Sequence, residues 1–357
     1  MTTWPRWIQK LESPTIEGGK RLNAKINDGT EYSPLISYVT VVRNNVKTLE
    51  RTILSVKEQT YKNTEHIIID GASTDGTLEL ILKYKDELDY YASEPDNGLY
   101  DALNKAIPLC RGELILVLNS DDWLSTNSAE YASKNYLFDK AQLICGTAKV
   151  LINEKDFVEW KPQKVSLTSY FTVANLNHNA VYASRKAYEK SGPYDSSYMI
   201  AADTKWILSC YDSGSNFTYT DNILVNYSLG GISSDIYWHM EECKRIIKEK
   251  FKFLKGDEVT ALHYMYYQWR EGFKYPLIGF DAKLEIAKLL EKYSDKKEFI
   301  NAIDINSEFF TQDIIVSEAN NIDTNIEDEN IECIKKVLNK YPFLYNISKK
   351  IYHFVKR

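Results

Sequence analysis

Acidic and turn-forming residues follow four apolar runs of the sequence, in a regular order along the chain. The four polar segments are VVRNN (Val41–Asn45), DGASTDGT (Asp70–Thr77), EPDNGLYDALNKA (Glu94–Ala106) and LNSDDW (Leu118–Trp123). If the apolar runs are parallel strands, their carboxyl ends meet at one edge of a sheet, where open α/β sheets bind their ligands. The spacing therefore predicts one ligand site built from four loops.

The pair Asp121–Asp122 follows the most hydrophobic of these runs directly. Adjacent carboxylates repel each other, and hard oxygen ligands of this kind suit Mg²⁺ or Mn²⁺ that bridges to phosphates. Taken alone, such a pair is also typical of a surface turn. DGASTDGT alone is likewise typical of a helix-capping turn, in which Gly71 and Gly76 permit a tight backbone and a polar residue caps the next helix.

The pattern around these segments indicates an α/β fold. Buried strands are expected at 36–42, 66–69, 90–92 and 114–118, with helices at 49–56, 78–82, 100–107 and 203–212. Strands that alternate with helices of this length form βαβ units, and these predict a mostly parallel sheet flanked by helices.

The length of 357 residues suits two domains, or one large domain with an appendage. Residues 1–33 lack sustained periodicity and are expected to form an N-terminal arm, and 34–235 form the α/β domain. From 236 to 357 the strand signal fades. Helices are expected there at 241–254, 259–269, 282–293 and 331–339.

Composition narrows the class of protein. The net charge of −6 argues against nonspecific nucleic-acid binding, which needs a basic surface. No apolar run approaches the ~20 residues that span a bilayer, and the first residues do not resemble a secretory signal. The cysteines lie far apart and are expected to be buried, reduced thiols of a cytoplasmic protein; they are Cys110, Cys145, Cys210, Cys243 and Cys333.

The chain resembles the family-2 glycosyltransferases with the GT-A fold in six motifs that occur in order. These motifs are SYVTVVRNN, SVKEQTYKNTEHIIIDGASTDGT, SEPDNGLYDALNKA, GELILVLNSDDW, IAADTKW and GGISS, and they cover about residues 34–235. Within the family the chain looks similar to enzymes that build bacterial surface polysaccharides. The resemblance implies a GT-A domain with a C-terminal helical extension. It also implies transfer of a hexose or N-acetylhexosamine from a UDP-sugar to a glycan hydroxyl, with Mn²⁺ or Mg²⁺ as cofactor.

The resemblance implies a role for several residues. Arg43 would face the nucleobase, and Asp70 would hold the uracil or ribose end of the donor. Asp121 matches the last acid of the D-x-D element and would ligate the metal, with Asp122 beside it as a second candidate ligand. Asp203, in IAADTKW, matches the general base on the acceptor side. The other implied donor-binding residues are Val41, Ser73, Gly98, Asp101, Asn104, Asn119 and Ser120.

The implied reaction is a single in-line displacement with inversion at the anomeric carbon. Asp203 would take the proton of the acceptor hydroxyl, for which a carboxylate within hydrogen-bond reach is enough, and no covalent intermediate is needed. The alternative interpretation of Asp203 is a negative charge placed at a helix N-terminus, where the helix dipole favours it.

Three positions depart from the family pattern. Gly71 stands where many relatives carry a second acid, Asn119 replaces the first acid of D-x-D, and Ala202 precedes Asp203 in place of an acid. These departures leave open a catalytically silent sugar-nucleotide- or glycan-binding subunit of an assembly complex. A sugar-1-phosphate nucleotidyltransferase is disfavoured, because the expected Gly-rich, basic phosphate loop is missing near the first strand.

Two histidines and one tryptophan carry further alternatives. His178 lies in a region that family members use for the acceptor, so we expect either a contact to the acceptor or a satisfied, partly buried histidine. Trp123 is a second candidate for the acceptor side. His239 follows GGISSD (Gly230–Asp235) and is either a third metal ligand, a residue of a loop that closes over the diphosphate, or an ordinary histidine at a helix start.

The C-terminal segment Tyr341–Arg357 contains no acid and interleaves Lys and Arg with aromatic residues. One expectation is peripheral contact with the inner face of the cell membrane, since acceptors in this family are often lipid-linked. The other is a helix docked on the protein's own body. The cytoplasm is the expected location in both cases.

Aromatic residues make up 13% of the chain, and many lie outside the donor motifs, around Tyr170–Phe171, Tyr237–Trp238 and Tyr264–Arg270. Aromatic faces stack on sugar rings, so this excess could mark an acceptor, partner or membrane surface. Core packing by the C-terminal helices would produce much the same count.

Overall fold

The computed structural model describes residues 7–22, 29–152, 156–172, 176–229, 236–271 and 288–303, without the side chains of 236–237 and 264–271. The predictions for Gly230–Asp235, Cys333 and Tyr341–Arg357, and for the side chains of Tyr237 and 264–270, lie outside the described residues. The chain divides into two compact units. One is Met1–Val165 with Ala174–His239, and the other is Ser166–Val173 with Met240–Arg357.

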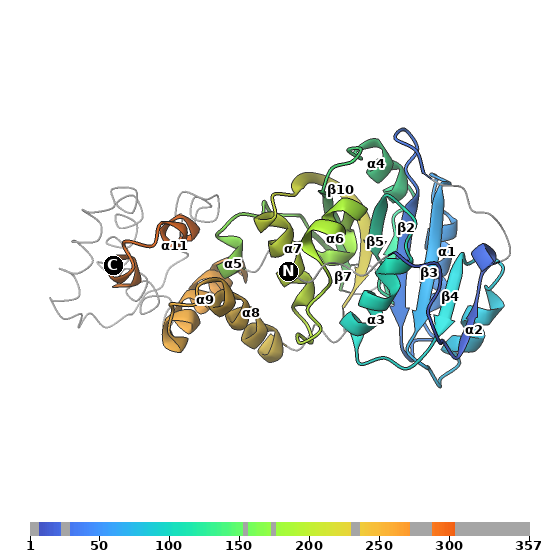
Figure 1. Ribbon diagram of the computed structural model, residues 1–357, viewed down its shortest axis with the longest axis horizontal. Helices are drawn as coiled ribbons and strands as arrows, with labels where there is room; N and C mark the ends of the chain where they lie inside the picture. Colours follow the sequence, from blue (N-terminus) through green and yellow to red (C-terminus); the bar gives the residue numbers. More distant parts are fainter. Residues whose placement is uncertain are drawn as a thin grey trace. The chain divides into compact units, whose positions relative to one another are not determined.

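The first unit is built around a single sheet whose central part is parallel (Figure 1). The parallel strands pair in the order β4-β3-β2-β5. Their bounds are Ile36–Val42 for β2, Thr64–Asp70 for β3, Tyr90–Ser93 for β4 and Leu114–Val117 for β5. In this register Val42 lies opposite Asp70, and Asp70 lies opposite Ser93, so the carboxyl ends of three strands are level with one another.

The sheet continues on both sides of this block. Beyond β5 the order is β9-β7-β10-β6, in which β7 and β10 are parallel to each other and β9 is antiparallel to its two neighbours. The bounds are Val181–Ser184 for β9, Gln142–Leu151 for β7, Asn216–Ser228 for β10, Trp123–Leu124 for β6 and Phe157–Trp160 for β8, which pairs with β7. The expected α/β class is confirmed, with antiparallel pairs added to the parallel block.

At the opposite edge, β1 (Ile16–Gly18) pairs antiparallel with β4. Part of the segment expected to be an arm, residues 1–33, therefore adds a strand to the sheet. The short 3₁₀ turn η1 (Lys20–Leu22) follows it.

Helices connect the strands of the first unit. They are α1 (Leu49–Lys57), α2 (Thr77–Lys83), α3 (Leu99–Ala106), α4 (Ser128–Lys134), α6 (Arg185–Ser191) and α7 (Ala202–Asp212), with 3₁₀ turns η2 (Ile107–Leu109) and η3 (His178–Ala180). In α1 the buried residues Leu49, Ile53 and Val56 recur at the helical period, as the sequence predicts.

Strand β2 is buried along its whole length, as expected for a parallel strand covered on both faces. Two of its interior polar residues, Ser37 and Thr40, are satisfied by side chains of the neighbouring strand β3. Ser37 Oγ donates to Glu65 Oε1 (2.5 Å), and Thr40 Oγ1 lies 3.0 Å from His66 Nε2.

The second unit is helical in its described part. Its elements are α5 (Ser169–Thr172), most of α8 (Ile236–Lys250), α9 (Gly256–Glu271), a helical stretch at 288–292 and α11 (Lys297–Ala302). Phe171 stacks on Phe251 with ring centroids 5.4 Å apart, and Phe299 packs edge-on against Phe251 at 5.5 Å. At Tyr170–Phe171, therefore, the aromatic residues form core rather than a binding surface.

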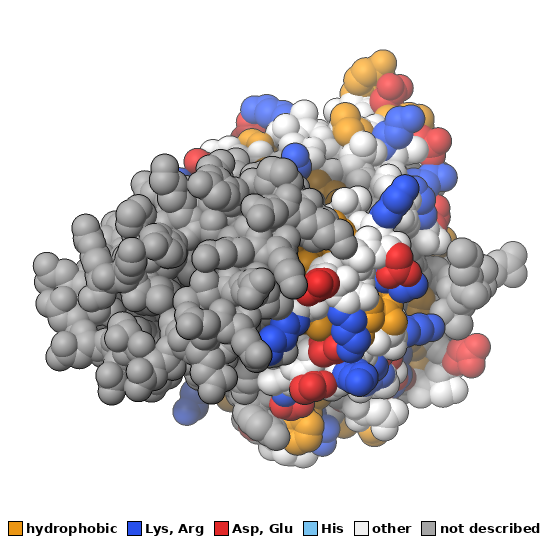
Figure 2. Space-filling model, turned by 90° about the vertical axis from the view of Figure 1, so that its left-hand side faces the viewer, with side chains coloured by type: hydrophobic (Ala, Val, Ile, Leu, Met, Phe, Trp, Pro, Cys, Tyr) orange, Lys and Arg blue, Asp and Glu red, His pale blue; other side chains and the backbone are white. Residues whose placement is uncertain are grey.

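The surface carries charges of both signs. Basic and acidic side chains are interspersed over the described part of the face in Figure 2. Exposed pairs such as Lys83–Glu50 (2.7 Å) are screened by solvent and add little to stability. Across the described ranges, no helix is both long and apolar enough to cross a membrane.

Four of the five cysteines are described, and these are buried free thiols, as predicted.

His66 should make the stability of the fold sensitive to acid. Burial, assisted by the charge of Lys20, lowers the pKa of His66 to about 3, so the folded state holds this imidazole neutral. Because the unfolded chain takes up the proton near pH 6.5, the free energy of unfolding should fall as the pH drops from about 6.5 towards 3. The slope approaches roughly 1.4 kcal/mol per pH unit for this group. Denaturant titrations should show a flatter pH dependence for His66→Gln; parallel curves for variant and wild type would contradict this assignment.

Candidate functional site

Hydrogen bonds join the loops that follow β2, β3 and β5. Asn45 donates its backbone N–H to Thr77 Oγ1 (2.9 Å) and its Nδ2 to Ser120 Oγ (2.8 Å). The backbone N–H of Asn44 donates to Ser73 Oγ (2.8 Å). The segments VVRNN, DGASTDGT and LNSDDW thus form one connected edge, as the strand order requires. Ser73 and Ser120 lie on this edge, and their contacts with the donor stay a prediction.

Asp70 is a buried carboxylate at the end of β3. It accepts hydrogen bonds from the Ser73 backbone N–H (3.1 Å) and from Ser93 Oγ (2.6 Å). Val41, in β2, is nearly buried, whereas Arg43, in the loop after β2, is exposed. The structure therefore places a fixed carboxylate and an exposed guanidinium at the ends of neighbouring strands.

A second carboxylate at this edge, Asp96, was missed by the sequence analysis. A Cβ at Gly71 would lie 2.3 Å from Asp96 Oδ2, so this carboxylate fills the space that a side chain at position 71 would take. Asp96 Oδ1 accepts the Gly98 N–H (2.9 Å), and Gly98 has φ +115°, which favours glycine. Two signals could have revealed Asp96: the loss of an acid at 71, and an acid two residues before Gly98.

Asp101 and Asn104 make structural contacts, and their expected place in the donor site stays a prediction. Asp101 Oδ2 accepts the Asn97 N–H (3.0 Å) and pairs with Lys105 (3.3 Å). Asn104 donates Nδ2 to the Tyr194 carbonyl (2.8 Å) and accepts the Tyr194 N–H at Oδ1 (2.9 Å). The amide of Asn104 is thus taken up by the loop that precedes α7.

Asp122 is fully buried and also has a structural role. Its Oδ1 accepts the Ser228 N–H (2.7 Å), and its Oδ2 accepts a hydrogen bond from Asn179 Nδ2 (2.9 Å). Burial raises the pKa of Asp122 to about 8, with the charge of Asp121 adding to it and the Ser228 N–H opposing it. The second candidate metal ligand is therefore turned inward, where it ties the loop after β5 to η3 and β10.

Asp121 is half-buried, and no other residue of the described ranges hydrogen-bonds its carboxylate. Burial raises the pKa of Asp121, and the charge of Arg51 opposes this shift. Arg51 also donates Nη2 to the Asp121 carbonyl (2.7 Å), and its Cζ lies 3.7 Å from the centre of the Trp123 ring. Two residues before Asp121, the Asn119 N–H donates to Asn179 Oδ1 (3.2 Å). Of the two adjacent acids, Asp121 is the one left for a ligand.

Asp203 lies in the first turn of α7 and is half-buried. Its Oδ1 accepts the Thr204 N–H (2.6 Å) and lies 3.3 Å from the hydroxyl of Tyr100, which also donates to the Ile200 carbonyl. The carboxylate is therefore held from one side by α3.

His178 makes the internal contact expected of a satisfied, partly buried histidine, and its contact with the acceptor stays a prediction. Its Nε2 lies 2.8 Å from the hydroxyl of Tyr194, and burial lowers its pKa, although the charge of Asp203 opposes this shift. His239 lies in the first turn of α8 and is half-buried. Among the described residues no group of three or more His, Cys, Asp or Glu side chains forms a ready metal site. The role of His239 as a metal ligand stays a prediction. The contact of Trp123 with the acceptor also stays a prediction.

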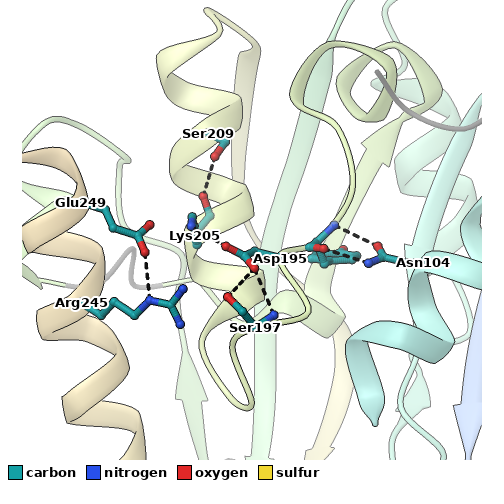
Figure 3. A network of polar contacts seen from close by, with 8 residues as sticks. Asn104, Asp195, Ser197, Lys205, Ser209, Arg245 and Glu249 are labelled. Atoms are coloured by element: carbon teal, nitrogen blue, oxygen red, sulfur yellow. Dashed lines mark hydrogen bonds and ion pairs between the residues drawn. The ribbon is translucent and has the colours of Figure 1, made fainter. Parts of the chain in front are cut away.

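Figure 3 shows the polar network that fixes the segment before Asp203. Asp195 accepts hydrogen bonds from Ser197 Oγ (2.6 Å) and Lys205 Nζ (2.7 Å). Although burial opposes it, the Lys205 and Ser197 hydrogen bonds lower the pKa of Asp195 to about 2. On α8, which is drawn in the same figure, Arg245 donates to Glu249 (2.9 Å).

Comparison with known proteins identifies the family. The profile of "Glycosyl transferase family 2" matches residues 37–193. An uncharacterized glycosyltransferase of Mycobacterium tuberculosis is 31% identical over 180 residues, which are 49% of this chain and 68% of that protein. The chain belongs to glycosyltransferase family 2. A PGL/p-HBAD biosynthesis glycosyltransferase of Mycobacterium bovis is 26% identical over 211 residues, covering 57% of this chain and 81% of the relative.

Solved structures of glycosyltransferases share the fold. Residues 1–349 of Staphylococcus aureus TarS, in complex with UDP-GlcNAc, align with a TM-score of 0.51 at 16% identity, over 75% of this chain and 89% of that one. A mannosyltransferase of Pyrobaculum calidifontis, in complex with GDP-Man and Mn²⁺, aligns with a TM-score of 0.50 at 15% identity, over 81% and 86%. The expected GT-A fold of this family-2 glycosyltransferase is thereby confirmed.

Substitution of Asp121 and of Asp122 should change the free energy of unfolding by different amounts. Asp122→Ala leaves the Ser228 N–H and Asn179 Nδ2 buried without their acceptor, which should lower the free energy of unfolding by about 1–3 kcal/mol. Asp121→Ala, the matched control, should change it by less than about 0.5 kcal/mol. Denaturant titration of both variants measures the difference, and equal losses would contradict the division of roles.

Proposed function

We propose that this glycosyltransferase is an inverting, metal-dependent enzyme. It moves a hexose or N-acetylhexosamine from a UDP-sugar to a glycan hydroxyl in the synthesis of a bacterial surface polysaccharide, such as O-antigen, capsule or exopolysaccharide. The carrying observation is the connected edge at the carboxyl ends of β2, β3 and β5, which unites the predicted donor residues Arg43, Asp70 and Asp121.

The charged residues at this edge suggest how the nucleotide of the donor would bind. The exposed Arg43 guanidinium would face the base, and Asp70, whose carboxylate is buried against Ser73 and Ser93, would help to hold the uracil or ribose end through the turn that it fixes after β3. UDP-GlcNAc and UDP are bound in the TarS structures, whereas the mannosyltransferase holds GDP-Man. The TarS complexes support a uridine nucleotide for this chain, with guanosine as the competing choice.

Asp121 fits a divalent cation by the chemistry of its donor atoms. It offers a half-buried carboxylate with which no other described residue forms a hydrogen bond, whereas Asp122 is already saturated. When bound, Mn²⁺ or Mg²⁺ would neutralise the donor diphosphate and make it a better leaving group. The mannosyltransferase structure contains Mn²⁺, which supports the same class of cofactor here.

Asp203 acts as the general base for the acceptor hydroxyl. As the acceptor oxygen bonds to the anomeric carbon, the bond from that carbon to the diphosphate breaks and its electron pair leaves with UDP. The acceptor proton passes to the Asp203 carboxylate, and one displacement of this kind inverts the anomeric centre. Asp203 lies in the first turn of α7, where the helix leaves backbone N–H groups without intrahelical acceptors.

The acceptor and the cellular location are extensions of the same proposal. The M. bovis relative is named for PGL/p-HBAD biosynthesis, which supports a glycoconjugate acceptor, including a lipid-linked one. Four buried, free cysteines support a reducing compartment such as the cytoplasm. Contact of Tyr341–Arg357 with the inner face of the cell membrane would bring the enzyme to lipid-linked acceptors.

The metal assignment is tested by release of UDP or GDP from UDP-glucose, UDP-galactose, UDP-N-acetylglucosamine and GDP-mannose. We expect turnover of a UDP-sugar with Mn²⁺ or Mg²⁺, its loss in EDTA, and its recovery when the metal is restored. Asp121→Ala should remove the metal-dependent activity while keeping the wild-type melting temperature. Full activity of this variant would contradict the assignment of Asp121.

The catalytic assignment is tested with Asp203→Asn, which keeps the size of the side chain. UDP binding measured by calorimetry should persist, while turnover should fall by a factor on the order of 10²–10⁴. Unchanged turnover would show that another residue is the base. UDP binding by the wild-type chain without turnover of any donor would instead favour the catalytically silent subunit.

A further inference from the structure

Helix α3 lies between the donor-side turn and the segment that carries Asp203. It begins directly after the Pro95–Gly98 turn, and its residues Tyr100 and Asn104 share one face because they are four positions apart. Asn104 makes two hydrogen bonds to the backbone of Tyr194, and the Tyr100 hydroxyl donates to the Ile200 carbonyl. One helix face thus holds both ends of the Tyr194–Ile200 segment.

Tyr100 reaches Asp203 itself. Its side chain is 4% exposed, its ring centroid lies 5.6 Å from that of Tyr194, and its hydroxyl lies 3.3 Å from Asp203 Oδ1. The Thr204 N–H donates to the same oxygen (2.6 Å). The Tyr100 hydroxyl has one proton, for which the Ile200 carbonyl and, at the longer distance, Asp203 Oδ1 are the two acceptors.

We propose that Tyr100 is a positioning residue for transfer, acting through the Asp203 carboxylate, and this inference rests on the proposed function. Tyr100 fixes the Ile200 carbonyl, three residues before Asp203, and places its hydroxyl beside Oδ1, which leaves Oδ2 to receive the proton of the acceptor hydroxyl. Since Tyr100 follows the donor-side turn by two residues, the base is aligned from the same helix that borders the donor. Orientation of this kind matters because a small displacement of a reacting group costs a large factor in rate.

The first experiment removes a single hydroxyl group. Tyr100→Phe keeps the buried ring, so the melting temperature and the Kd for UDP should stay close to wild type, while kcat for the turned-over UDP-sugar should fall by about 10- to 100-fold. The matched control is Tyr90→Phe, which removes a buried phenol whose hydroxyl donates to Glu17 (3.0 Å) on the neighbouring edge strand. Tyr90→Phe should keep the wild-type kcat.

A double-mutant cycle separates positioning from general support of the fold. If Tyr100 acts through Asp203, adding Tyr100→Phe to Asp203→Asn should reduce kcat by no more than about twofold further, because the base is already absent. A merely structural role would lower kcat by the same factor in both backgrounds and would also weaken UDP binding. Either of these results overturns the inference.

The outcomes also distinguish this inference from the proposed function. Wild-type turnover with an unaffected Tyr100→Phe variant overturns the positioning role and leaves the glycosyltransferase assignment intact. Wild-type turnover that survives Asp203→Asn removes the base and the positioning role together. A wild-type chain without turnover contradicts the proposed function itself.

Discussion

The parallel pairing of β2 with β3 on one side and with β5 on the other is the constraint on which the site depends. Parallel strands end at the same edge, so residues far apart in the chain become neighbours there. Asn45 makes this visible, because its backbone and side chain reach the β3 and β5 loops at once. The buried, β-branched character of β2 holds this edge in place, and the polar loops are arranged around it.

Burial and hydrogen bonding divide the carboxylates of this region into two groups. Asp122 and Asp195 have their oxygens taken up by neighbouring donors, and they fix the loops on either side of the site. Asp121 and Asp203 are half-buried; no other described residue hydrogen-bonds the Asp121 carboxylate, and both contacts of Asp203 are made by Oδ1, so these two acids are the ones proposed to act in transfer. Asp122 and Asp195 therefore hold the segments that carry the two acids proposed to react. The proposed transfer would need this arrangement, because reacting groups must be placed before the donor arrives.

The sequence was informative where the signal is local. The strands β2 to β5, helix α7 and the family follow from apolar periodicity and from motifs in a fixed order, because both depend on neighbouring residues. The contacts and the burial of a side chain depend on packing between residues that are far apart in the sequence. Thus the direction in which Asn104 points, the burial of Asp122 and the approach of Asp96 to Gly71 could not be read from spacing. The edge strand β1 was missed because three residues are too few to show a period.

The fit between Gly71 and Asp96 also links two positions of the sequence that lie in separate loops. No side chain can be added at 71 while the carboxylate at 96 stays where it is, since the added Cβ would lie 2.3 Å from Asp96 Oδ2. The two positions should therefore vary together among relatives. Chains with an acid at the place of Gly71 should carry a smaller or redirected residue at the place of Asp96, and chains with glycine there should keep the acid in the turn before α3. One negative charge at this corner would then be preserved, although the strand that supplies it changes.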